Sequence, residues 1–86
     1  MNHVHQLDEW IEVAQKLGYH IRYDYFGGTG GGVCQYGGKK WLFIDLALPP
    51  QEQLDLISTT LNADPLLDTV KISSRLREEI SHRRVA

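Results

Sequence analysis

The sequence has 86 residues, a formal net charge of −2 and one cysteine, Cys34. A chain this short builds one modest core, so we expect a single domain over residues 1–86, for which self-association is a natural supplement to stability. One cysteine excludes an internal disulfide, and no apolar run approaches the ~20 residues that span a bilayer. Because the N-terminal stretch has the pattern of an amphipathic helix and not of a signal peptide, the sequence predicts a cytoplasmic protein without a membrane partner.

Charge is distributed unevenly along the chain. Residues 1–68 carry four Lys or Arg against nine Asp or Glu, whereas residues 69–86 carry five against two. The acidic body and the basic tail can attract each other, within one chain or between two copies. Nucleic-acid binding requires a denser basic patch than this tail offers, so the sequence predicts no nucleic-acid partner.

The first predicted element is an amphipathic helix that ends at Gly18. Its apolar residues recur at spacings of three and four and are Leu7, Trp10, Ile11, Ala14 and Leu17. A glycine directly after the last periodic residue supplies the positive φ at which many helices end. The pattern therefore predicts a helix of about 12 residues before the first strand.

Three strand-like segments follow this helix. Residues 19–26 alternate in polarity and are rich in aromatic side chains, which is typical of a strand. Residues 33–36 and 39–46 flank Gly37 and Gly38, and a glycine pair between two such segments favours a two-residue hairpin turn. Residues 39–46 are apolar on both faces, so we expect this strand to lie centrally or to be covered on both sides.

The next predicted element is a second helix. Pro49 and Pro50 end the last strand and suit the first turn of a helix. Its buried side carries Leu54, Ile57 and Leu61, which recur at spacings of three and four.

A last, charged helix is predicted over residues 73–82, with Ser73 or Ser74 as its cap. Residues 69–72 are a candidate fourth short strand. The predicted fold is therefore α+β: a helix, a three-stranded antiparallel meander and then two helices. We expect the first two long helices to pack on one face of the sheet and the last helix to cover an edge or to reach a partner.

A glycine-rich stretch lies between the first two strands and comprises Gly27, Gly28, Thr29, Gly30, Gly31 and Gly32. It matches neither phosphate-binding motif. Gly38 stands where a P-loop requires lysine, and Val33 stands where the dinucleotide fingerprint requires its third glycine. The stretch also leads into a strand, whereas phosphate binding needs a helix N-terminus. We expect a structural loop, with a contact surface for another chain as the alternative.

Imidazole and thiol groups offer a second candidate site. His3, His5, His20 and Cys34 are all acceptable zinc ligands, but their spacing matches no recognised zinc site. Cys34 has His20 as a candidate base if their strands pair, although no positioned acid or oxyanion donor follows from the sequence. We expect no metal, no cofactor and no catalytic residue, with His20 and Cys34 as the alternative metal ligands.

Residues 17–21, 38–45 and 48–53 follow one another in an order that resembles the strand, hairpin and helix entry of the ImmA/IrrE-type metallopeptidase domain. The resemblance extends over about residues 17–61. Apart from it, we expect a small bacterial protein. The family's zinc site comes from a His-Glu-x-x-His sequence soon after this helix start. At the matching positions this chain has Thr59, Thr60 and Ala63. The resemblance therefore implies a related scaffold without the peptidase site.

The leading hypothesis is a non-catalytic interaction or regulatory domain that binds a second copy of itself or another protein. The expected contact residues come from the glycine stretch and from aromatic positions, and are Gly28, Thr29, Gly30, Gly31, Tyr23, Tyr25 and Trp41. The competing hypothesis is a small-ligand or metal-binding protein, with an enzymatic role left open, that uses residues 27–32 together with His20 and Cys34.

Overall fold

The fold comes from a computed structural model that describes residues 3–28 and 31–85, with side chains described for residues 6–28 and 31–80. Its elements in chain order are α1 (His3–Lys16), β1 (Tyr19–Asp24), β2 (Gly31–Tyr36), β3 (Lys39–Asp45), α2 (Pro50–Asn62), the 3₁₀ helix η1 (Pro65–Thr69) and α3 (Ser74–Val85). The α+β class and the order of one helix, three strands and two helices are confirmed, and η1 is an addition. Within the described chain, no helix combines the length and the apolar content that crossing a bilayer requires.

Local signals set the ends of the helices as the sequence predicts. Gly18 follows α1 with a φ of 95°, the left-handed conformation that ends a helix. Pro50 occupies the first turn of α2. Ser73 caps α3, because its Oγ accepts a hydrogen bond of 3.1 Å from the N–H of Leu76. These ends depend on the backbone preferences of a few residues, which is why the sequence predicts them well.

The sheet differs from the predicted antiparallel meander. Its strand order is β1-β3-β2, with β2 and β3 in the expected antiparallel hairpin and β1 parallel to β3 on the other side. Gly37 and Gly38 form the hairpin turn with φ angles of 61° and 77°, as a primed two-residue turn requires. The meander prediction is wrong because β1 pairs with β3, whereas in a meander each strand pairs with its neighbour in the chain. In this fold β3, which is apolar on both faces, has a strand on each side instead.

The candidate strand at residues 69–72 is not a strand in the structure. η1 takes up Pro65–Thr69, and Asp64 caps it by accepting a hydrogen bond of 2.9 Å from the N–H of Leu66. Ser73 then caps α3. The two capped helices leave too few residues between them for a paired strand.

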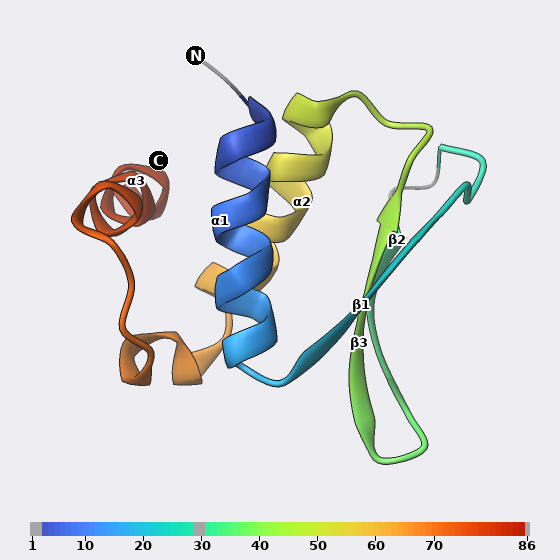
Figure 1. Ribbon diagram of the computed structural model, residues 1–86, viewed down its shortest axis with the longest axis horizontal. Helices are drawn as coiled ribbons and strands as arrows, with labels where there is room; N and C mark the ends of the chain where they lie inside the picture. Colours follow the sequence, from blue (N-terminus) through green and yellow to red (C-terminus); the bar gives the residue numbers. More distant parts are fainter. Residues whose placement is uncertain (1–2, 29–30, 86) are drawn as a thin grey trace.

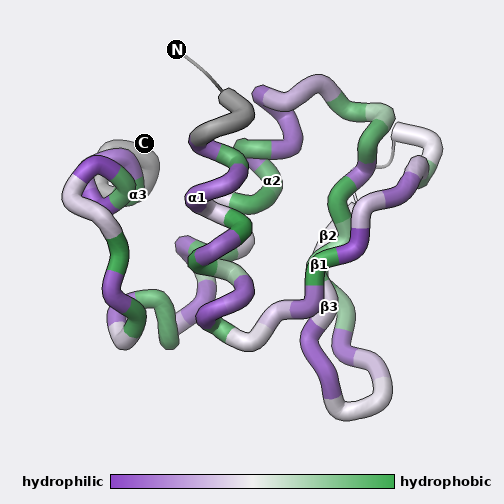
Figure 2. Tube along the Cα trace, in the orientation of Figure 1, coloured by the Kyte–Doolittle hydropathy of each residue, from purple (hydrophilic) through white to green (hydrophobic). Residues whose placement is uncertain are grey.

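Two helices cover one face of the sheet. Figure 1 shows α1 and α2 side by side against the sheet, with α3 on the far side of these helices. Tyr19, Leu42 and Ile44 face the helical layer and are buried. The rest of the core is formed by Trp10, Val13, Ala14, Leu17, Leu54, Ile57, Leu61, Leu67, Leu76 and Ile80. In Figure 2 the described part of α3 is mainly hydrophilic, as expected for a helix that meets the core along one edge.

The opposite face of the sheet, which we call the open face, carries His20, Gly32, Cys34, Trp41 and Phe43. These residues alternate along the strands with those that face α1 and α2, and no described helix lies over them. β3 therefore lies centrally, as predicted, but helices cover only one of its faces.

Candidate functional site

The open face carries a row of aromatic rings. Trp41 and Phe43 stack with their ring centroids 6.1 Å apart and 14° between their planes. His20 lies 5.2 Å from Trp41, and Phe26 meets the edge of Phe43 at 5.7 Å. We call these four residues the aromatic row. His20 lies in β1, Trp41 and Phe43 lie in β3, and Phe26 follows the end of β1. Phe26, Trp41 and Phe43 are half-buried and His20 is exposed. Aromatic side chains that lie together on a face without a helix are typical of a contact surface.

The predicted aromatic contact residues fall on different surfaces. Trp41 lies on the open face, whereas Tyr23 is the register partner of Ile44 and lies on the helix side, where it is 50% exposed. Burial and then the negative charge of Asp8 raise the pKa of Tyr23. Tyr25 follows β1 and is 73% exposed. Because Tyr23 and Trp41 lie on opposite faces, they do not form one flat contact surface.

The connection from β1 to β2 is tied to the end of β3 by a buried aspartate. Asp45 is fully buried, and its Oδ1 accepts hydrogen bonds from the N–H groups of Phe26 at 3.1 Å and Ala47 at 2.9 Å. The N–H of Leu46 also donates to the carbonyl of Asp24 at 2.9 Å. These bonds join the start of the glycine loop to the residues that follow β3. The connection from β1 to β2 therefore helps to hold β1 against the end of β3.

Gly31 is a residue at which this fold requires glycine. Its φ is 78°, and a Cβ at this position would overlap the carbonyl oxygen of Phe43. Gly28 also has a positive φ, but nothing lies near its missing Cβ. Two further predicted contact residues, Thr29 and Gly30, lie outside the described residues. At Gly31 the backbone of β3 therefore approaches the glycine-rich stretch closely, within the same chain.

His20 and Cys34 do not form a joint site. Both are register partners of Trp41, but from opposite sides of it. Neighbouring strands lie about 4.8 Å apart, so the two residues are separated by about 10 Å across the sheet. Zinc ligands need bonds of about 2.0–2.3 Å, and a nucleophile must lie within hydrogen-bond reach of its base. Among the described residues, no group of three or more His, Cys, Asp or Glu is placed to hold a metal.

A polar cluster on the helix side joins β1, β3 and the start of η1. The hydroxyl of Tyr19 donates a hydrogen bond of 2.8 Å to Oδ2 of Asp64. The Nζ of Lys40 lies 3.6 Å from the same oxygen and 4.3 Å from the centre of the Tyr19 ring. Burial, then the hydrogen bond to Asp64 and its charge, raise the pKa of Tyr19 to about 12. Burial alone would raise the pKa of Asp64, but the hydrogen bonds it accepts and the charge of Lys40 lower it overall.

This cluster borders a hollow of about 450 Å³ beside β2, whose remaining lining residues are Val33, Thr60, Ala63 and Pro65. The polar groups of the cluster already have partners in one another. Asp64 accepts from Tyr19, lies beside Lys40 and caps η1 with its second oxygen. The cluster therefore has a structural role: it links the sheet to the end of α2.

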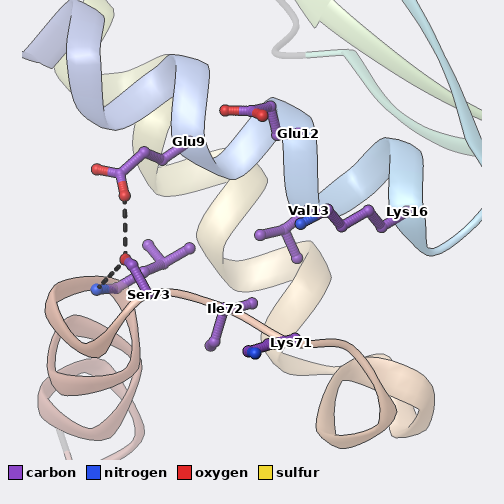
Figure 3. Close-up of a pocket in the computed structure, with 8 residues that line it drawn as sticks. Glu9, Glu12, Val13, Lys16, Lys71, Ile72 and Ser73 are labelled. Atoms are coloured by element: carbon purple, nitrogen blue, oxygen red, sulfur yellow. Dashed lines mark hydrogen bonds between the residues drawn. The ribbon is translucent and has the colours of Figure 1, made fainter.

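A second hollow, of about 170 Å³, lies where α3 and the segment before it meet α1 (Figure 3). Glu9 points toward Ser73, whose Oγ donates a hydrogen bond of 3.1 Å to it, and Glu9 also pairs with Arg75. The Glu9 carboxylate is therefore bound by residues of the same chain. Contact between the acidic body and the basic tail is made here within one chain.

The positions that the metallopeptidase resemblance matches to a zinc site carry no suitable ligand. Thr59 is exposed on α2, while Thr60 and Ala63 line the hollow beside β2. None of the three supplies an imidazole or a carboxylate. Comparisons of the chain with protein-family models, curated proteins and solved structures give no match. The resemblance stays a prediction.

Proposed function

We propose that this chain is a non-catalytic interaction domain that self-associates through its sheet. The observation that carries the proposal is the aromatic row on the open face, over which no described helix lies. Aromatic side chains contribute a large apolar area when a second surface covers them. A chain of this length has a small core, so apolar contacts that a second copy makes at this sheet add stability that the single chain lacks.

An interaction role fits the chemistry of the chain better than an enzymatic one. His20 and Cys34 are held apart by Trp41, and the polar cluster around Tyr19 is satisfied by its own members. The metallopeptidase resemblance points in the same direction, because its zinc positions carry threonine and alanine in this chain.

Sedimentation velocity over a range of protein concentrations tests the proposal. We expect the wild-type chain to shift from monomer to dimer as its concentration rises. Phe43→Thr removes a ring from the open face and keeps a good strand former, so it should weaken association by up to about tenfold, the worth of one aromatic contact. Tyr23→Thr is the matched loss on the helix side and should leave association unchanged. A wild-type monomer at every concentration would contradict self-association.

A further inference from the structure

We infer that two copies of this chain pair edge to edge through β2, in one defined register. The inference deepens the proposed self-association and rests on it. β3 is the only neighbour of β2 in the described sheet, and residues 33–36 of β2 are exposed. Figure 1 shows the β2-β3 hairpin reaching beyond the helical layer. A free strand edge offers unpaired N–H and C=O groups to which a second strand can bond.

The two edges of the sheet differ in their protection against such pairing. β1, the other edge, carries Arg22 and Asp24, and charged side chains discourage a second strand. β2 contains no charged residue and no proline. In a symmetric antiparallel pair each strand meets a copy of itself, so a neutral strand places no like charges opposite one another. A second copy of β2 therefore suits this edge.

The hairpin turn determines which residues of β2 face its free edge. Tyr36 and Lys39 flank the two-residue turn and form a hydrogen-bonded pair, and such pairs alternate along an antiparallel ladder. Every second residue from Tyr36 back to Gly32 therefore directs its backbone groups to β3. Val33 and Gln35 direct theirs outward. A second strand must bond to the backbone of these two residues.

One symmetric register uses both outward residues. In this register Val33 bonds to Gln35 of the second copy, and Gln35 bonds to Val33 of the second copy. The two Cys34 residues then lie opposite each other on the two-fold axis. Tyr36 lies opposite Gly32 of the second copy, in a pair whose Cα atoms are about 4.5 Å apart.

This register places an exposed aromatic ring over a matching hollow. A shallow hollow of about 250 Å³ is lined by Gly32 and its neighbours Phe26, Gly31, Val33 and Phe43. Tyr36 is 76% exposed in the single chain. In the paired sheet its ring enters the hollow of the second copy and packs toward Phe43. Aromatic rings stabilise strand glycines in this way across neighbouring strands. The two-fold axis makes the contact twice and joins the two aromatic rows into one surface.

The native cysteine tests the register directly. In this register Cys34 lies opposite Cys34 of the second copy, so mild oxidation of the purified chain should give a disulfide-linked dimer. Peptide mapping should then show the Cys34–Cys34 link. Cys34→Ser combined with Tyr25→Cys moves the only thiol to an exposed position outside β2, and this variant should form far less linked dimer. A chain that dimerises in solution but does not link through Cys34 would overturn the register and leave the proposed self-association intact.

Two further variants test the edge pairing by sedimentation velocity. Gln35→Pro removes an outward N–H, and proline is tolerated at such edge positions, so the variant should fold and be monomeric. Tyr36→Ala should weaken dimerisation by about tenfold or more, whereas Tyr25→Ala, an equally simple loss of an exposed ring outside β2, should not. Circular dichroism melts confirm that each variant is folded.

The outcomes separate this inference from the function on which it rests. A folded Gln35→Pro variant that dimerises as tightly as the wild type would overturn pairing through β2 alone. A wild-type chain that stays monomeric at high concentration would overturn both the proposed self-association and the pairing of β2 with a second copy. In that case the free edge of β2 would be left for a strand of another protein.

Discussion

The hydroxyl of Tyr19 donates a hydrogen bond of 2.8 Å to the carboxylate of Asp64, which lies 45 residues further along the chain. The bond joins the first residue of β1 to the cap of η1, and Lys40 of β3 lies beside the same carboxylate. Tyr19 is only 8% exposed. A hydrogen bond to a charged group that is shielded from water contributes more than an exposed neutral one. This contact therefore helps to hold the sheet against the end of α2.

We expect Tyr19→Phe to lower the free energy of unfolding by about 1.5–3 kcal/mol, because Asp64 loses a donor. Tyr25→Phe is the matched control, since the Tyr25 ring is 73% exposed. That control should change the free energy by no more than about 0.5 kcal/mol. Urea denaturation followed by circular dichroism measures both values. Equal losses in the two variants would show that the Tyr19 hydroxyl makes no special contribution.

The same tyrosine predicts a loss of stability at high pH. The pKa of Tyr19 is raised to about 12 in the folded chain, compared with about 10 for an ordinary tyrosine. The folded state therefore holds this proton more tightly than the unfolded state. Its contribution is complete below pH of about 10 and is lost as the pH rises through the raised pKa. The urea midpoint of the wild type should fall more steeply in this window than that of Tyr19→Phe.

Asp64 predicts the opposite dependence at low pH. Its pKa is lowered in the folded chain, so ionised Asp64 stabilises the fold at pH values above the ordinary carboxyl pKa of about 3.9. This contribution is lost as the pH falls below that value and through the lowered pKa. Asp64→Asn should reduce stability at neutral pH by about 1–3 kcal/mol and flatten the acid side of the stability curve. An unchanged acid transition in this variant would exclude Asp64 as its source.

Gly31→Ala should destabilise the fold more than Gly28→Ala. The two glycines have similar positive φ angles, 78° and 80°, so each substitution carries a conformational cost of about 1–2 kcal/mol. Only at Gly31 does the added Cβ overlap the carbonyl oxygen of Phe43. We expect this overlap to add about 1–3 kcal/mol by displacing the backbone of β3. Urea denaturation of the two variants gives the comparison, and equal costs would contradict the close approach at Gly31.

Removing the Asp45 carboxylate should loosen the start of the glycine loop. Asp45→Ala removes an acceptor of the N–H groups of Phe26 and Ala47 and should lower the free energy of unfolding by about 1–3 kcal/mol in all. Asp45→Asn keeps an oxygen acceptor and should cost less. Hydrogen exchange gives a local measurement, because the Phe26 amide should exchange faster in Asp45→Ala. Unchanged exchange there would show that other contacts hold the loop.

Interactions between neighbouring residues made much of the fold predictable. Gly18 and Pro50 mark helix ends, and the turn at Gly37 and Gly38 closes the hairpin, because each depends on the backbone angles that one or two residues prefer. The place of β1 was not predictable in this way. Whether it pairs with β2 or β3 depends on burial beneath α1 and α2, which involves residues far apart in the chain.

In the candidate site, too, local features were predictable and the pairing of strands was not. Alternation along a strand separates Tyr23 from Asp24 and Trp41 from Leu42, but it cannot relate the faces of two strands until their pairing is known. With β1 beside β3, Trp41 stands between His20 and Cys34 and on the face opposite to Tyr23. A joint site for His20 and Cys34 depended on a strand pairing that the fold does not contain.

The sequence by itself determined the α+β class, the helices, the hairpin and the failure of the glycine stretch to match a phosphate-binding motif. Each of these follows from side-chain periodicity or from turn chemistry within a short segment. Only the tertiary structure decided that β1 pairs with β3 in parallel, that Gly31 lies against Phe43 and that β2 is left as a free edge. Those features arise from packing between distant segments, because the burial of apolar side chains selects which strands become neighbours.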